Sequence, residues 1–160
     1  MKILVTGAQG FVGRNLTAEL CNRGYTELYL YDIDTDPALL DAYTKDCDFV
    51  FHLAGVNRPQ DESEFDSGNR GFTQELLSRL ERHNNACPVV VASSAQAVRD
   101  NAYGRSKKAA EDVAFAYAQR TGARVMVYRL PNLFGKWCRP NYNSVVATFC
   151  HNIARGLDIQ

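Results

Sequence analysis

Tyr103 and Lys107 place a phenol and an ammonium group four residues apart at the start of a predicted helix. Residues at i and i+4 share one face of a helix, so the two groups would lie side by side. A free phenol has a pKa of about 10 and is a poor acid or base at neutral pH. A neighbouring cation stabilises the phenolate and lowers this pKa, so the pair is suited to proton transfer. The hydroxyl of Ser94 could hold a substrate carbonyl in line with the phenol.

Glycines stand three residues apart near the beginning of the chain, directly after the apolar run 3–6. This order of strand, glycine turn and helix start is typical of a site for a dinucleotide pyrophosphate. The helix N-terminus adds free N–H groups and the positive end of a dipole. The predicted cofactor-binding residues here are Gly7, Gly10, Phe11, Val12 and Gly13.

Asp32 follows the second apolar run, about 20 residues after the glycine turn, where a carboxylate binds the ribose of a dinucleotide. The same charge would repel a 2′-phosphate, which favours NAD over NADP. Asp34 is the alternative for this role.

Elements that alternate between strand and helix must position these groups. Strands are predicted at 3–6, 28–31, 49–53, 89–92 and 125–130, and helices at 11–21, after Pro37, around 72–80, at 103–120 and at 144–154. Such alternation predicts an α/β fold, a Rossmann-like doubly wound parallel sheet, for which we expect the strand order 3-2-1-4-5. That order would put the fourth strand beside the first, so Ser93 and Ser94 would lie next to the glycine turn.

Composition excludes several other classes of protein. Eighteen acidic residues balance eighteen basic ones, so no strong field attracts nucleic acid or a membrane surface. The five cysteines lack metal-ligand spacing, and we expect small reduced thiols and no metal site. Without a secretory signal or a membrane-spanning run, the expected location is the cytoplasm.

The motifs together resemble those of the extended short-chain dehydrogenase/reductases, which include nucleotide-sugar epimerases and dehydratases. They run in family order: TGAQGFVG, DFVFHLAG, GNRGFT, Ser93-Ser94, Tyr103 with Lys107, and RLPNLFG. The resemblance implies an NAD(P)-dependent enzyme with Ser94, Tyr103 and Lys107 catalytic. It implies that Asn69 stabilises the active-site helix or a bound water. It also places Leu53, Ala54 and Gly55 along the adenosine, and Pro131 and Asn132 between nicotinamide and sugar.

The runs HLAGVNRP and RLPNLFGKWCRPNYNSVVATFCHNIA resemble a narrower group, bacterial surface-polysaccharide or capsule reductases. These act on UDP-2-acetamido-2,6-dideoxy-4-keto-hexoses on the route to UDP-N-acetyl-L-fucosamine. The resemblance implies a UDP-sugar substrate and favours NADP(H), so NAD and NADP both remain open. Lys136 and Arg139 are predicted to meet the diphosphate, and Trp137 either stacks on a base or sugar or packs within a lid.

Extended members of the family are considerably longer than this chain. We therefore expect an NAD(P)-binding domain at 1–135 and an incomplete substrate-binding region at 136–160, from a full-length homodimer. As an N-terminal fragment, the chain should bind cofactor but turn over little or no sugar.

Two other functions remain open at this stage. One is a nucleotide-sugar 4-epimerase or 4,6-dehydratase, although Ala95-Gln96 stands where a dehydratase usually has an acidic pair. The other is a cofactor-binding protein without turnover, which would not need Tyr103 and Lys107.

Overall fold

Five parallel strands form one sheet in the computed structural model, which describes residues 1–159. The strands are β1 (Ile3–Thr6), β2 (Leu28–Tyr31), β3 (Phe49–His52), β4 (Val89–Ser94) and β5 (Val125–Leu130). The longer helices are α1 (Phe11–Asn22), α2 (Pro37–Asp46), α4 (Phe72–Arg82), α5 (Ala102–Thr121) and α6 (Val145–Ile153). Three short elements complete the set: α3 (Ser63–Phe65), the π-helical turn η1 (Asp66–Gly71) and the 3₁₀ turn η2 (Ala95–Val98). The predicted doubly wound α/β fold is confirmed.

The predicted strand order 3-2-1-4-5 is wrong, because the observed order is β2-β1-β3-β4-β5. β3 pairs with β1 on one side and with β4 on the other, so β4 is not a neighbour of β1. After β2 the chain passes back across β1, and a right-handed crossover then places α2 on the face opposite α1. Burial agrees with this order, since the edge strand β2 contains no fully buried residue whereas β3 buries Val50 and His52.

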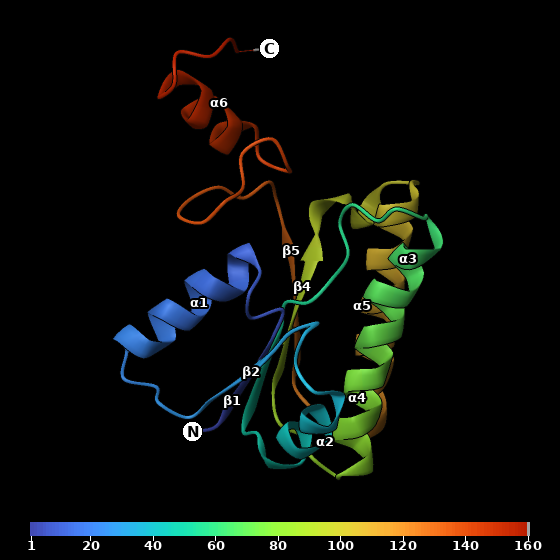
Figure 1. Cartoon of the computed structure of the whole chain (residues 1–160). Coiled ribbons are helices and arrows are strands. Elements are labelled where there is room, and N and C mark those ends of the chain that lie inside the picture. Colours follow the sequence, from blue (N-terminus) through green and yellow to red (C-terminus); the bar gives the residue numbers. More distant parts are fainter. Residues whose placement is uncertain (160) are drawn as a thin grey trace.

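Helices cover both faces of the sheet (Figure 1). α1 lies on one face, where Leu20 packs with Ile3 and Val5 of β1. α2, α4 and α5 lie on the other face, where Leu4 of β1 packs in the larger apolar cluster. Alternate side chains of a strand point to opposite faces, which explains how β1 serves both clusters. Each fully buried aliphatic side chain contributes about 1.5–3 kcal/mol, so these clusters fix the carboxyl edge of the sheet in place.

Side-chain caps fix where α5 and α6 begin. Asn101 caps α5, with its Oδ1 accepting a hydrogen bond from the Gly104 N–H at 2.7 Å. Ser144 caps α6 in the same way by accepting from Ala147. Gly122 ends α5 in the left-handed conformation, the usual helix stop.

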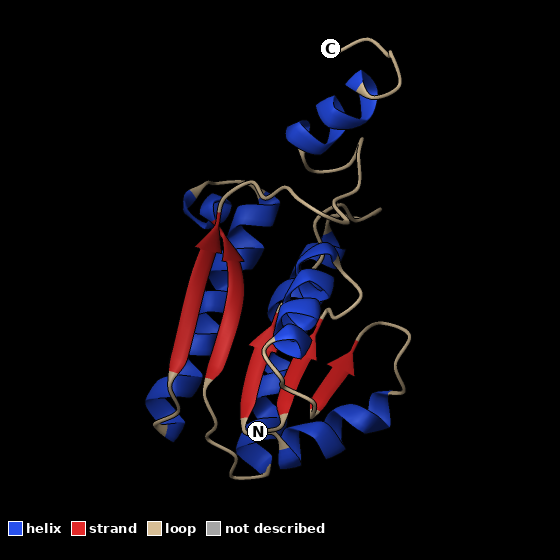
Figure 2. Cartoon of the chain, turned by 90° about the vertical axis from the view of Figure 1, so that its left-hand side faces the viewer, coloured by secondary structure: helices blue, strands red, loops and turns tan. Residues whose placement is uncertain are grey.

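α6 extends beyond the carboxyl edge of the sheet and buries none of its residues (Figures 1 and 2). Over residues 1–159, no helix has the combination of length and apolar character needed to cross a bilayer.

Candidate active site

The glycine turn between β1 and α1 presents bare backbone to the carboxyl edge of the sheet. Gly7 has a φ of +69°, and a Cβ there would lie 2.7 Å from the Ala54 nitrogen. A Cβ on Gly13 would lie 2.1 Å from the Gly7 oxygen, so α1 packs directly on the turn. Gly10 caps α1 without a side-chain hydrogen bond, which leaves the first N–H groups of the helix to an anion. This cradle fits the pyrophosphate of a dinucleotide.

Asp32 lies beside the glycine turn, just after β2. Its Oδ2 accepts a hydrogen bond from the Gln9 N–H at 2.7 Å, and its Oδ1 accepts one from the Ile33 N–H at 2.8 Å. A carboxylate has about four lone-pair sites, so these bonds orient it and leave capacity for ribose hydroxyls. Asp34 instead accepts from the side-chain amide of Gln9 at 2.8 and 3.0 Å.

Tyr103 and Lys107 lie one turn apart at the start of α5. The Lys107 Nζ is 6.0 Å from the centre of the Tyr103 ring and donates to the Ala92 carbonyl of β4 at 3.3 Å. The Lys107 side chain is buried and has no carboxylate partner among residues 1–159, and this burial lowers its pKa from 10.5 to about 8. Near neutral pH the amine is therefore still a cation, but one that is close to losing its proton.

The pKa of the Tyr103 phenol is higher than that of an exposed tyrosine. Burial raises its pKa, and the nearby Ser94 side chain opposes that change by hydrogen bonding. The expected lowering of this pKa by Lys107 is not found in this structure. Burial of the phenol is the main cause of the raised pKa.

Asn69 connects the loop after β3 to α5 from inside the π-helical turn η1. Its side chain accepts from the Val56 N–H and donates to the Val56 carbonyl, both at 3.1 Å. Its Nδ2 also donates to the Ser106 Oγ at 3.0 Å, next to Lys107 in the chain. With 2% of its surface exposed, Asn69 holds two parts of the site together.

Glu111 was not predicted as part of the site, although it continues the stripe of Tyr103 and Lys107 along α5. Its carboxylate is fully buried and accepts from Arg129 of β5 at 2.8 and 2.6 Å and from the Ser93 hydroxyl at 2.5 Å. Burial raises the pKa of Glu111, but the Arg129 and Ser93 hydrogen bonds outweigh it and the pKa is lowered overall. Ser93 therefore points into the fold and anchors β4 to α5. The spacing of four residues between Lys107 and Glu111 was the signal in the sequence that could have indicated its place on this face of α5.

His52 was also not predicted, and it links the glycine turn to Asn69. Its Nδ1 is 2.8 Å from the Thr6 hydroxyl, and its Nε2 is 2.9 Å from the Thr73 hydroxyl. Thr73 donates to the Asn69 carbonyl at 2.7 Å, so its oxygen accepts from the His52 Nε2–H. The Nδ1 then accepts from Thr6. Burial, together with the Lys107 charge, lowers the His52 pKa from 6.5 to about 3, so the imidazole is neutral.

Comparison with known proteins agrees with this geometry. The model of the NAD dependent epimerase/dehydratase family matches residues 3–160. The chain belongs to this family. It is 49% identical over all of its 160 residues to a UDP-2-acetamido-2,6-beta-L-arabino-hexul-4-ose reductase from Pseudomonas aeruginosa, of which it covers 43%.

Two solved structures share the fold of this chain. The capsular polysaccharide assembling protein CapF from Staphylococcus aureus matches with a TM-score of 0.88 and 45% identity. The match covers 100% of this chain and 43% of CapF. MoeE5 in complex with UDP-glucose and NAD matches with a TM-score of 0.73 and 29% identity, over 89% of this chain and 58% of MoeE5. The chain thus spans less than half the length of the reductase and of CapF.

The segment after β5 carries three predicted substrate residues, Asn132, Lys136 and Arg139, all of them exposed, whereas Ser94 is half-buried at the end of β4. Pro131 and Asn132 follow β5 directly. Lys136 stacks on Trp137 beside α1, whereas Arg139 stacks on Tyr142, so the two predicted diphosphate ligands contact different aromatic rings.

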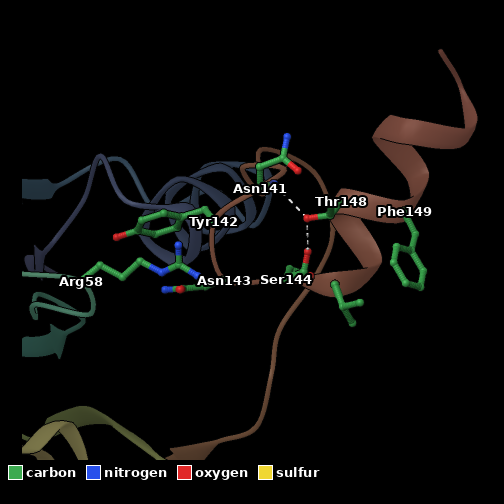
Figure 3. A pocket seen from close by; sticks show the side chains of 8 residues that line it. Arg58, Asn141, Tyr142, Asn143, Ser144, Thr148 and Phe149 are labelled. Atoms are coloured by element: carbon green, nitrogen blue, oxygen red, sulfur yellow. Dashed lines mark hydrogen bonds between the residues drawn. The ribbon is translucent and has the colours of Figure 1, made fainter. Parts of the chain in front are cut away.

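An open hollow of about 460 Å³ lies where this segment meets the loop after β3 and the start of α6 (Figure 3). Two arginines approach the Tyr142 ring: the Cζ of Arg58 is 5.1 Å from its centre and the Cζ of Arg139 is 5.3 Å from it. Ser144 and Thr148 line the opposite part of the hollow (Figure 3). Its wall is therefore cationic and rich in hydrogen-bonding groups.

Metal-ligating residues do not cluster in the described part of the chain. Residues 1–159 contain no group of three or more His, Cys, Asp or Glu side chains placed to hold a metal. The five cysteines are free thiols, with the Sγ atoms of Cys47 and Cys87 3.8 Å apart.

Proposed function

We propose that this chain forms the cofactor-binding and proton-transfer part of a reductase. The substrate would be a UDP-linked 2-acetamido-2,6-dideoxy-4-keto-hexose used for surface polysaccharide. The observation that carries the proposal is the arrangement of Ser94, Tyr103 and Lys107 at the carboxyl edge of a sheet that also bears the glycine cradle. The reductase from Pseudomonas aeruginosa, similar over the whole chain, supports this class of substrate.

The cofactor supplies a hydride when it is bound. Gly7, Gly10 and Gly13 would hold its pyrophosphate, and Asp32 its adenosine ribose. Ser94 would orient the C4 carbonyl of the sugar by donating a hydrogen bond to its oxygen. Tyr103 would give the proton of its Oη to that oxygen, and Lys107 would stabilise the phenolate that remains.

The similarity to the Pseudomonas aeruginosa reductase supports reduction over epimerisation, because it extends over the whole chain. A carbonyl reductase needs a phenol that still carries its proton, and the raised pKa of Tyr103 is compatible with that role.

Asp32 supports NAD as the preferred cofactor. Its carboxylate is held beside the glycine turn by two backbone N–H groups, and Asp34 adds a second negative charge nearby. A 2′-phosphate would meet both charges. Calorimetric titration of the chain with NADH and NADPH tests this: Asp32→Ala should weaken NADH binding and improve NADPH binding. A parent chain that strongly prefers NADPH would show that the preference lies elsewhere.

The activity is tested by replacing Tyr103 in the full-length natural protein. Tyr103→Phe should lower kcat for the UDP-4-keto sugar by roughly a hundredfold or more, the scale of general acid catalysis. NADH binding should change little. Tyr128→Phe is the matched control, because Tyr128 lies on β5 with 55% of its surface exposed. Equal turnover by Tyr103→Phe and Tyr128→Phe would rule out the proposed role.

We also propose that residues 1–135 form the cofactor-binding part and that residues 136–160 contribute one side of the sugar site. The contacts of Arg58 and Arg139 with the Tyr142 ring, beside the hollow at the start of α6, support the second assignment. Analytical ultracentrifugation of the full-length protein tests the expected homodimer.

A further inference from the structure

Two cations approach the single tryptophan of the chain, and one of them belongs to the cofactor helix. The Arg14 Cζ is 5.4 Å from the centre of the Trp137 ring, and the Lys136 Nζ is 4.4 Å from it. Arg14 lies one turn after Gly10, to whose carbonyl its N–H donates at 2.9 Å. This group, Arg14, Trp137 and Lys136, is called the cation–indole stack below.

The stack is fixed at the level of the glycine turn. The Asn15 Nδ2 donates both to the carbonyl of Phe11, the first residue of α1, at 2.8 Å and to the carbonyl of Lys136 at 2.9 Å. Trp137 has a φ of +67°, in the left-handed region that a bulky residue rarely adopts. Such a conformation persists where surrounding contacts determine it, and strained residues of this kind cluster at ligand sites.

The charges of the stack are not neutralised within the described chain. Over residues 1–159, neither Arg14 nor Lys136 forms an ion pair with a carboxylate. Other helix arginines do pair, such as Arg23 with Glu19 one turn away on α1 itself. Arg14 and Lys136 therefore add two free positive charges to the positive end of the α1 dipole.

We infer that the cation–indole stack is a second binding element for the pyrophosphate of the dinucleotide cofactor. The glycine turn would hold this group through backbone N–H groups, and Arg14 and Lys136 would hold it through charge-assisted hydrogen bonds. The inference rests on the proposed cofactor binding. A nucleotide sugar also carries a diphosphate, but the Asn15 contacts attach the stack to the helix whose N-terminus forms the cofactor cradle.

Trp137 provides a direct readout, because no other tryptophan emits in this chain. Its emission overlaps the absorption of NADH, so NADH bound beside it should quench the fluorescence. ADP-ribose carries the diphosphate without a nicotinamide and should shift the emission, whereas adenosine should not. UDP, added as a separate probe, should have little effect.

One double variant, which removes both charges, tests the ligands themselves. Arg14→Met with Lys136→Met keeps the apolar stems and should raise the Kd for NADH roughly tenfold or more, the scale of hydrogen bonds to charged groups. The loss of affinity in added salt should also become smaller. Arg124→Met, at an exposed cation directly before β5, is the control and should bind NADH as the parent does. Asn15→Ala, which releases the segment from α1, should weaken binding as well.

The outcomes separate this inference from the proposed function. A parent chain that binds NADH without Trp137 quenching, and with equal affinity in the double variant, would overturn the inference and leave cofactor binding intact. A shift of emission with UDP but not with ADP-ribose would assign the stack to the nucleotide sugar and would also overturn it. Failure of the parent to bind NADH at all would remove the proposed function and the inference with it. Circular dichroism of each variant checks that the fold is unchanged.

Discussion

Replacing the buried His52 should change how the stability of this protein depends on pH. The imidazole lies between Thr6 and Thr73 with 3% of its surface exposed, and it is neutral in the folded protein. His52→Asn removes the titrating ring but keeps one donor and one acceptor. We expect the variant to be less stable at pH 7 by about 1–3 kcal/mol, the cost of disturbing buried hydrogen bonds.

The pH effect follows from the two pKa values of His52. An unfolded histidine takes up a proton near pH 6.5, whereas the folded ring does so only near pH 3. Its contribution to stability is therefore complete above pH 6.5 and is lost as the pH falls toward 3. Between pH 6.5 and 4.5, before most carboxylates titrate, this loss amounts to about 2–3 kcal/mol at 1.36 kcal/mol per pH unit.

Urea unfolding at several pH values measures the effect. The parent should lose this amount of unfolding free energy between pH 6.5 and 4.5, and His52→Asn should show a much flatter profile. His151→Asn, which removes a histidine on α6, is the control and should keep the parental slope. Parallel profiles for the parent and His52→Asn would show that the folded ring titrates normally and would refute the buried neutral network.

Three further outcomes are expected from the structure. Gly10→Ala should lower the Tm only slightly, because its Cβ would lie 3.2 Å from the Gly7 oxygen, a tight contact that a small shift relieves, but it should weaken NADH binding by about tenfold in calorimetry. Gly13→Ala should instead cost about 1–3 kcal/mol of stability, because its Cβ overlaps backbone. Glu111→Gln should lower the free energy of unfolding in urea by about 2 kcal/mol, because it breaks a buried ion pair whose arginine partner is partly exposed. Asp112→Asn is the control and should lower it little. The free energy of unfolding of the parent should rise by about 3 kcal/mol between pH 8 and 10.5, because in this range only the unfolded lysine still holds its proton. Lys107→Met should remove this rise.

The strands and helices could be predicted because their signals are local. Apolar runs, the glycine turn and the stop at Gly122 lie within a few residues of the elements that they define. Boundaries shifted by only one or two residues: α5 begins at Ala102, and β4 continues to Ser94. The acidic stretch 61–66 contains α3 and leads into the π-helical turn that carries Asn69, two elements that the sequence did not predict.

The strand order could not be predicted, because it depends on where β3 lies after α2: beside β2, or on the far side of β1 as observed. Right-handed crossovers and buried apolar strands are compatible with both orders. Tertiary packing decides between them, through the burial of Val50 in β3 and the more exposed position of β2. The pKa of Tyr103 was unpredictable for a related reason, since it depends on burial that no spacing along the chain reveals.

The wrong strand order and the unpredicted His52 have one cause. In the predicted order, β4 would lie beside β1. Thr6 would then be next to the serines of β4, and no strand would lie between the glycine turn and the strand that packs on α5. In the observed register Thr6 is instead the partner of His52, so β3 separates the two halves of the site. A polar link must then cross β3, and His52 provides it by connecting Thr6 to Thr73 and, through Thr73, to Asn69. A histidine at the end of an otherwise apolar strand is thus explained by its place between the cofactor cradle and the helix of Tyr103.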